Sequence, residues 1–248
     1  MRSQSITMGR NRTGVRTSPI DSADVVRTAR ATCVEDDGDG RGLAQLRRSY
    51  ESEAGSIGSI PLPTTLRGAF HAAFDLLRGR RTAALVDTLG ERLAFERMTT
   101  RLYEALLTKH DDGGSWPGGP ARVELAEFHD EELSHVGLLR GTIAEIGADP
   151  TVETPAADVM SMAASGLIQV ATDPRTTLDQ ALHALLAAEL YDNDGWQMLI
   201  DAARADGKEG LVPRFQRAQQ AEAIHLRYVR RWLGSAVDTE ARVDDEAG

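Results

Sequence analysis

The stretch LAEFHDEELSHVGLL (residues 125–139) places Glu132 and His135 inside an otherwise apolar helical stripe. The apolar residues at positions 125, 128, 136 and 139 follow the spacing of an amphipathic α-helix. Because Glu132 and His135 are three residues apart, their side chains lie on adjacent turns of one helix face. The same Glu-x-x-His pattern recurs in AEAIHLRYV (residues 221–229), where it comprises Glu222 and His225. Two helices therefore direct a carboxylate and an imidazole toward the predicted core.

Two further long helices each carry a glutamate in the middle of the apolar stripe. Glu96 follows leucines at positions 85, 89 and 93, and Glu189 follows leucines at positions 178, 182 and 185. A lone carboxylate in a protein core is costly and is normally protonated or paired. Four carboxylates that converge on one bundle centre would repel one another, so we expect positive charge among them. Two divalent cations would balance the four charges, and carboxylate and imidazole ligands suit iron or manganese.

The remaining periodicity predicts an all-α fold. We expect long helices over residues 82–110, 120–147, 176–205 and 213–234, and a shorter helix over residues 156–171. The short connections make the first two and the last two long helices antiparallel neighbours. The connection between the second and third long helices is long enough to cross the bundle from end to end. The pattern therefore predicts a four-helix bundle with one long crossover between the second and third helices.

The ends of the chain have a different composition from the predicted bundle. Residues 1–64 lack long apolar periodicity and are interpreted as an irregular N-terminal extension, with a short helix near residues 43–53. Residues 65–236 are predicted to form the bundle, preceded by a short helix over residues 66–79. Residues 237–248 are rich in acidic side chains and are predicted to be a tail.

The six polar residues on the apolar stripes resemble the ligand set of the ferritin-like superfamily, which includes ferritins, bacterioferritins, rubrerythrins and manganese catalases. The resemblance covers residues 82–234 and implies a ferritin-like bundle that holds two iron ions or, alternatively, manganese. It implies that Glu132 and Glu222 bridge the metals and that one histidine binds each metal. The implied metal ligands are Glu96, Glu132, His135, Glu189, Glu222 and His225.

The same resemblance implies redox chemistry with oxygen or peroxide as the small substrate. Tyr103, seven residues after Glu96, is a candidate catalytic residue with a redox or proton-transfer role. Trp196 stands where rubrerythrins repeat this tyrosine, and we interpret it as a core residue. The single cysteine excludes a rubredoxin module with paired cysteines, so the electron donor would be external. Two alternatives remain open: a metal-handling or stress-protection protein without turnover, and a bundle whose site is vestigial.

Other polar residues lie beside the predicted ligands. His129, one turn before Glu132, is interpreted as a surface or supporting side chain, and Glu131 as a solvated one. Asp192 and Asn193, one turn after Glu189, are weighed as hydrogen-bond partners of a ligand histidine, against an ordinary structural role.

Composition restricts the setting in which the chain works. Its 248 residues carry 28 basic and 38 acidic side chains, for a net charge of −10, which argues against a nucleic-acid partner or an anionic membrane. No run of about 18 apolar residues predicts a membrane span. The N-terminus lacks the apolar segment of a secretory signal. With a single cysteine, we expect a cytoplasmic protein, and the sequence leaves a homodimer open.

Overall fold

The structure is a computed structural model that describes residues 19–32, 40–60, 80–151 and 153–247, the side chains at 80, 81 and 240–247 excepted. Within these ranges the chain forms seven α-helices and one short 3₁₀ helix, and no β-strand. The predicted all-α fold is therefore confirmed for the described residues. The short helix predicted over residues 66–79 lies outside them. None of the described helices combines the length and the apolar character that crossing a membrane requires.

The chain separates into two compact units, Arg2–Ser56 and Ile57–Gly248. The described part of the first unit contains α1 (Pro19–Thr32) and α2 (Arg41–Glu53), and neither helix buries a residue. Helix α2 matches the short helix expected near residues 43–53. Helix α1 lies in a segment expected to be irregular, although Pro19 at its start and Asp21 in its first turn are ordinary helix-start signals.

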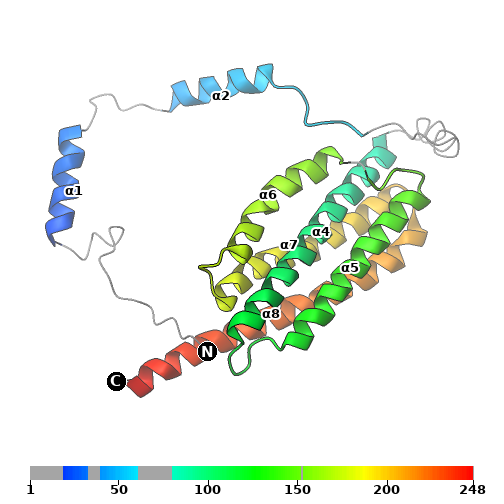
Figure 1. Cartoon of the computed structure of the whole chain (residues 1–248). Coiled ribbons are helices and arrows are strands. Elements are labelled where there is room, and N and C mark those ends of the chain that lie inside the picture. Colours follow the sequence, from blue (N-terminus) through cyan, green and yellow to red (C-terminus); the bar gives the residue numbers. More distant parts are fainter. Residues whose placement is uncertain (1–18, 33–39, 61–79, 152, 248) are drawn as a thin grey trace. The chain divides into compact units, whose positions relative to one another are not determined.

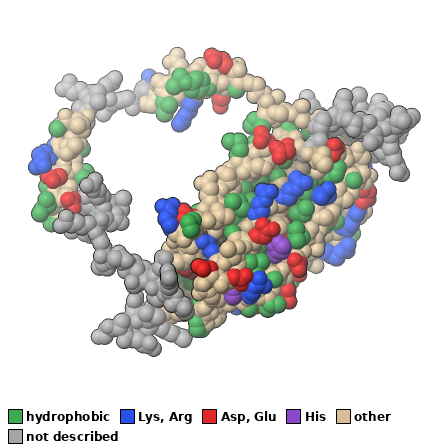
Figure 2. All heavy atoms as spheres, in the orientation of Figure 1, with side chains coloured by type: hydrophobic (Ala, Val, Ile, Leu, Met, Phe, Trp, Pro, Cys, Tyr) green, Lys and Arg blue, Asp and Glu red, His purple; other side chains and the backbone are tan. Residues whose placement is uncertain are grey.

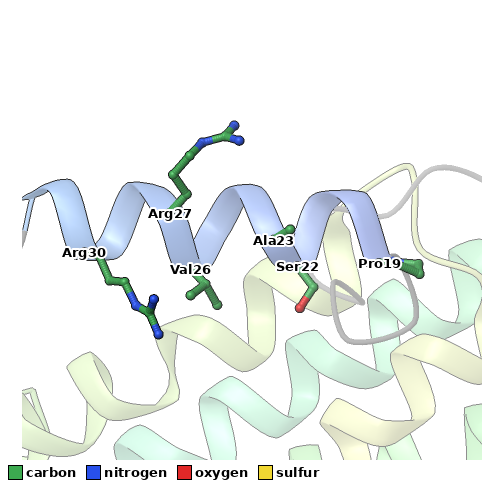
Figure 3. A pocket seen from close by; sticks show the side chains of 6 residues that line it. All are labelled: Pro19, Ser22, Ala23, Val26, Arg27 and Arg30. Carbon is green, nitrogen blue, oxygen red and sulfur yellow. The ribbon is translucent and has the colours of Figure 1, made fainter.

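A shallow hollow follows the surface of α1. Figure 3 shows its described lining, with Arg27 extending from the side of the helix opposite to Val26 and Arg30. All of the described lining residues come from this one helix.

The second unit contains the helices that correspond to the predicted bundle (Figure 1). They are α4 (Arg80–Gly113), α5 (Arg122–Glu145), α6 (Pro155–Thr172), α7 (Leu178–Ala205), the 3₁₀ helix η2 (Glu209–Leu211) and α8 (Val212–Ala247). Helix α4 packs against α5 and α7, and α8 packs against α7 and α5. Helix α6 lies in the connection between α5 and α7 and packs against α4 and α7. Because α6 returns the chain along the bundle, α5 and α7 run in the same direction, as Figure 1 shows.

Two clusters of buried apolar side chains lie at different levels of these helices. One cluster includes Leu102 and Leu106 of α4 together with Leu182 and Trp232. The other includes residues nearer the start of α4, such as Leu85 and Leu89, with Trp196 and Phe215 of other helices. Burying a large apolar side chain contributes about 1.5–3 kcal/mol, so both clusters stabilise the packing of the helices. On the face seen in Figure 2, charged side chains of both signs are interspersed with apolar ones.

Two helix ends differ from the sequence-based expectation. Helix α4 continues through the acidic Asp111–Asp112 pair and ends at Gly113, where Gly114 adopts a positive φ of 72°. Helix α8 does not end near Gly234 but continues to Ala247, so the segment predicted to be an acidic tail is helical. Residues 235–247 contain neither proline nor glycine, so no strong helix breaker follows Gly234 and the helix can continue.

A close approach between α4 and the start of α6 yields a stability prediction. A Cβ atom at Gly90 would lie 2.4 Å from Oγ1 and 2.7 Å from Cγ2 of Thr154. Thr154 is the buried N-cap of α6 and accepts a hydrogen bond from the Ala157 backbone at 3.3 Å, so it has little freedom to move. Gly90→Ala should therefore lower the free energy of unfolding by about 1–3 kcal/mol, as measured by chemical denaturation.

Gly141 of α5 provides the matched control, because a Cβ atom there would meet nothing within 4 Å. Gly141→Ala should raise stability by up to about 1 kcal/mol, since alanine is the better helix former. Shifts of the same sign in both variants would contradict the close approach of α4 and α6.

Candidate metal centre

Four helices each direct one glutamate into a common buried layer. Glu96 of α4, Glu132 of α5, Glu189 of α7 and Glu222 of α8 are each 0% exposed. His135 and His225, three residues after two of these glutamates, are buried with them. The structure thus brings together all six residues that the sequence marks as metal ligands.

The six side chains form two overlapping groups. Glu96, Glu132, His135 and Glu222 form one group, and Glu132, Glu189, Glu222 and His225 form the other. Within each group, one potential ligand atom from every residue lies within 4.8 Å of the others. Glu132 and Glu222 belong to both groups, and each group adds one further glutamate and one histidine. These buried groups could hold metal ions.

Several oxygen atoms in this layer have no hydrogen-bond partner among the described residues. They are Oε2 of Glu96, Glu132 and Glu189, whereas the two carboxylate oxygens of Glu222 each face only a histidine nitrogen. A buried polar atom without a partner costs about 1–3 kcal/mol, and more when it is charged. An ion pair or a bound cation would remove this cost, so the residues fit a cation among them.

The two histidines contact the two shared carboxylates. Nδ1 of His135 lies 2.6 Å from Oε1 of Glu222. Nδ1 of His225 lies 3.0 Å from Oε2 of Glu222 and 3.2 Å from Oε1 of Glu132. Both Nδ1 atoms therefore face the carboxylate cluster, where each could bind a cation held by its own ligand group.

Tyr103 and Trp196 border the carboxylate layer on opposite sides of the two groups. The Tyr103 hydroxyl donates a hydrogen bond of 2.6 Å to Oε1 of Glu189, and Tyr103 is fully buried. Burial and the neighbouring Glu189 carboxylate raise the pKa of Tyr103, so its hydroxyl keeps its proton. Trp196 packs at 5.4 Å from the His135 ring, edge to face, in agreement with its interpretation as a core residue.

A buried ion pair that the sequence did not predict lies beside the site. Arg92 of α4 is 0% exposed and donates to Oε1 of Glu96 at 2.5 Å and to Oδ1 of Asp192. Asp192 therefore bonds an arginine, so the structure supports the structural role that was weighed for it and not the hydrogen bond to a ligand histidine. Asn193 donates instead to the Glu189 backbone carbonyl at 2.9 Å. The sequence offered one indication of this role, because Arg92 lies one turn before Glu96 on the same helix face. In the structure, Gly195 of α7 leaves room for its guanidinium.

Glu131 also belongs to the surroundings of the site, although it was expected to be solvated. Its side chain is 51% exposed, but Oε2 lies 2.6 Å from Nε2 of His225. The prediction missed this contact because Glu131 lies off the apolar stripe of α5. His129 lies outside both ligand groups and contacts Glu104 and Asp130 instead.

The charges of the buried layer are unbalanced. Five carboxylates with 0% exposure, those of the four candidate ligand glutamates and Asp192, share the layer with one guanidinium, which leaves four negative charges among them when the histidines are neutral. Burial raises the pKa of Glu189 to about 8, and burial together with Glu222 raises the pKa of Glu132 well above its usual range. Burial also opposes ionisation of Glu96, but Arg92 and His135 together outweigh it and lower the pKa of Glu96 to about 2. The metal-free site therefore retains protons that a cation would displace.

The histidines respond to the same imbalance. Burial opposes the charged form of His135, yet its contacts with Glu222 and Glu96 raise its pKa to about 10. Burial likewise opposes the charged form of His225, and Glu222 and Glu189 raise its pKa to about 9. In the absence of metal, both imidazoles thus take protons that offset part of the negative charge.

Comparison of the chain with protein-family models, with curated proteins and with solved structures gives no match.

These pKa shifts predict how the metal-free protein responds to pH. The raised pKa values of Glu189 and the two histidines mean that the folded state binds more protons than the unfolded state between about pH 4.5 and about pH 10. Stability should therefore fall as the pH rises through this window. The melting temperature of protein in a chelator, measured at about pH 6 and about pH 9, checks this sign.

Glu189→Gln should flatten this dependence, because it removes one of the groups that hold extra protons. Addition of Mn²⁺ should flatten it as well, because metal replaces protons at the same atoms. A melting temperature of the metal-free protein that rises between the two pH values would contradict the assigned shifts.

Proposed function

We propose that this chain is a ferritin-like protein that binds two divalent metal ions, iron or manganese, inside its helical bundle. Glu132 and Glu222 would bridge the two ions. Glu96 and His135 would complete one position, and Glu189 and His225 the other. The assignment of iron or manganese rests on the donor set, because carboxylate and imidazole ligands suit these metals.

One observation carries the proposal: the two buried ligand groups overlap in two carboxylates, Glu132 and Glu222. A single cation site would need only one such group. Two groups that share two bridging residues are what a pair of closely spaced cations requires. The four glutamates of the two groups carry four negative charges when ionised, which equal the charge of two divalent ions and support the same stoichiometry.

The order of the helices also supports a ferritin-like bundle. Helices α4 and α5 are joined by a short connection, and so are α7 and α8, whereas α6 lies in the long connection between the two pairs. In ferritin-like proteins two helices contribute a glutamate and the other two a Glu-x-x-His motif. In this chain α4 and α7 carry the single glutamates, and α5 and α8 carry the motif.

A metal pair bound by these six residues would supply redox chemistry with oxygen or peroxide. The chain's own residues would control the surroundings. The apolar clusters on either side of the carboxylate layer exclude bulk water. The Tyr103 hydroxyl, 2.6 Å from Glu189, holds a proton that it can share with this carboxylate. Electrons would come from an external donor, because the chain has one cysteine and no paired-cysteine module.

Metal content is the first test of the proposal. Protein loaded anaerobically with Fe²⁺ or with Mn²⁺ and then desalted should hold two equivalents of metal, as measured by elemental analysis. Glu132→Ala should lower this content by at least one equivalent, because Glu132 belongs to both ligand groups. His129→Ala, one turn away on the same helix, is the control and should retain two equivalents.

Equal metal content in wild type and Glu132→Ala would contradict the proposed site. Wild-type protein that retains no metal while remaining folded would favour the alternative that the site is vestigial.

Reaction with an oxidant separates an enzyme from a metal-handling protein. The Fe²⁺-loaded protein should consume hydrogen peroxide or oxygen repeatedly when an external reductant is supplied, in amounts well above its bound metal. Tyr103→Phe removes the hydrogen bond to Glu189 and should lower the rate by about 10-fold or more if the hydroxyl transfers a proton. A single oxidation of the bound metal without further consumption would favour metal handling without turnover.

A further inference from the structure

The two proposed metal positions share Glu132 and Glu222, so any difference between them must come from the other residues. We propose that the positions are unequal and fill in order: the Glu189/His225 position binds metal first and more tightly, and the Glu96/His135 position binds second. Glu131 strengthens the first position and Arg92 weakens the second. This inference rests on the proposed function, since it assumes that metal binds between the six ligands.

The Nε2 atom of His225, which points away from the carboxylate cluster, contacts a further carboxylate. Nε2 of His225 lies 2.6 Å from Oε2 of Glu131, while its Nδ1 faces Glu132 and Glu222. A carboxylate that accepts the outer N–H of a ligand histidine holds the ring in one tautomer and makes the other nitrogen a stronger ligand. The Glu131 carboxylate also adds negative charge near the Glu189/His225 position.

His135 lacks this support. Its Nδ1 faces Glu222 and Glu96, at 2.6 Å and 3.7 Å. Within the described part of the chain, no carboxylate lies within ion-pair distance of its Nε2. His135 is instead packed edge to face against Trp196, which contributes no negative charge. The two histidines are therefore alike in that Nδ1 faces the carboxylate cluster, but they differ in the contacts of Nε2.

The two terminal glutamates also differ, and their difference favours the same Glu189/His225 position. In each, Oε1 accepts a hydrogen bond and Oε2 has no hydrogen-bond partner and is left for a metal. For Glu189 the donor is the neutral hydroxyl of Tyr103, whereas for Glu96 it is the guanidinium of Arg92. A cation bonded to a carboxylate withdraws part of its negative charge, so Glu96 is the weaker metal ligand of the two.

Arg92 cannot move away when metal arrives. It is fully buried, and Asp192 accepts a hydrogen bond from the same Nη2 atom that bonds Glu96. A Cβ atom at Gly195 would lie 2.2 Å from Nη1 of Arg92, so α7 fits closely around the guanidinium. The Trp196 and Phe95 rings flank it, at 5.5 Å and 5.0 Å from the guanidinium carbon. Its positive charge is thus a permanent part of the Glu96/His135 position.

A titration with Mn²⁺ followed by electron paramagnetic resonance tests the order of filling. With one equivalent, wild-type protein should give the signal of isolated Mn²⁺, and the signal of a coupled pair should grow only with the second equivalent. His135→Ala should still bind one Mn²⁺ with nearly wild-type affinity, whereas His225→Ala should lose the tight binding step. Equal losses in the two variants, or a coupled signal that grows from the first addition, would overturn the inference.

The role of Glu131 has its own matched pair of variants. Glu131→Gln keeps the size of a half-exposed side chain and should weaken the first Mn²⁺ step by about 10- to 100-fold while leaving the second step less affected. Glu127→Gln removes the same charge one turn earlier on the exposed face of α5, and should change neither step by more than about threefold, because solvent and salt screen that charge. Equal effects of the two variants would show that Glu131 acts only as surface charge.

The role of Arg92 is tested by the double variant Arg92→Met with Asp192→Asn, which removes both charges of the buried pair. The second Mn²⁺ step should tighten until the two steps approach each other, and an unchanged ratio of the two affinities would refute the role of Arg92. If this variant does not fold, the histidine and Glu131 variants still decide the inference. No Mn²⁺ bound by wild-type protein would instead refute the proposed function, a result distinct from two Mn²⁺ ions bound with equal affinity.

Discussion

The rest of the structure depends on one electrostatic constraint, the excess of negative charge buried between two apolar clusters. Five carboxylates share this layer with a single guanidinium. Such a layer destabilises a bundle unless protons, arginine or metal ions neutralise it. In the metal-free protein, the raised pKa values of Glu189, His135 and His225 mean that bound protons neutralise part of this charge. The apolar packing above and below the layer supplies the stability that keeps these charges together.

The layer is also asymmetric, and the asymmetry lies in the residues around the ligands. Arg92, which also bonds Asp192, donates to Glu96 alone among the six candidate ligands of the described residues. Tyr103 and Glu131 flank the other side, at Glu189 and His225. The candidate ligands thus repeat approximately, as one glutamate and one Glu-x-x-His motif in each helix pair, whereas the residues around them do not repeat. A dinuclear site with different surroundings for each ion can give its two metals different tasks.

The sequence predicted the parts of the structure that depend on periodicity. Glu96, Glu132, Glu189 and Glu222 could be found because each interrupts an apolar stripe, and a polar residue at a core position is conspicuous. Glu131 could not be found this way, since it lies off the stripe of α5 and reaches His225 only because α5 and α8 pack together. Arg92 was missed because a long arginine at the edge of a stripe usually extends to solvent. Helix α1 and the end of α8 have no strong apolar periodicity, so they were expected to be an irregular segment and a tail and were not predicted as helices.

The central claim is that two cations lie between the shared carboxylates, and diffraction from a crystal soaked with Mn²⁺ tests it most directly. Anomalous scattering should give two peaks in the buried layer, each within ligand distance of both Glu132 and Glu222, with the stronger peak beside His225 at limiting metal. A fully soaked crystal with one peak or none between these carboxylates, or with Mn²⁺ only on the protein surface, would contradict the account.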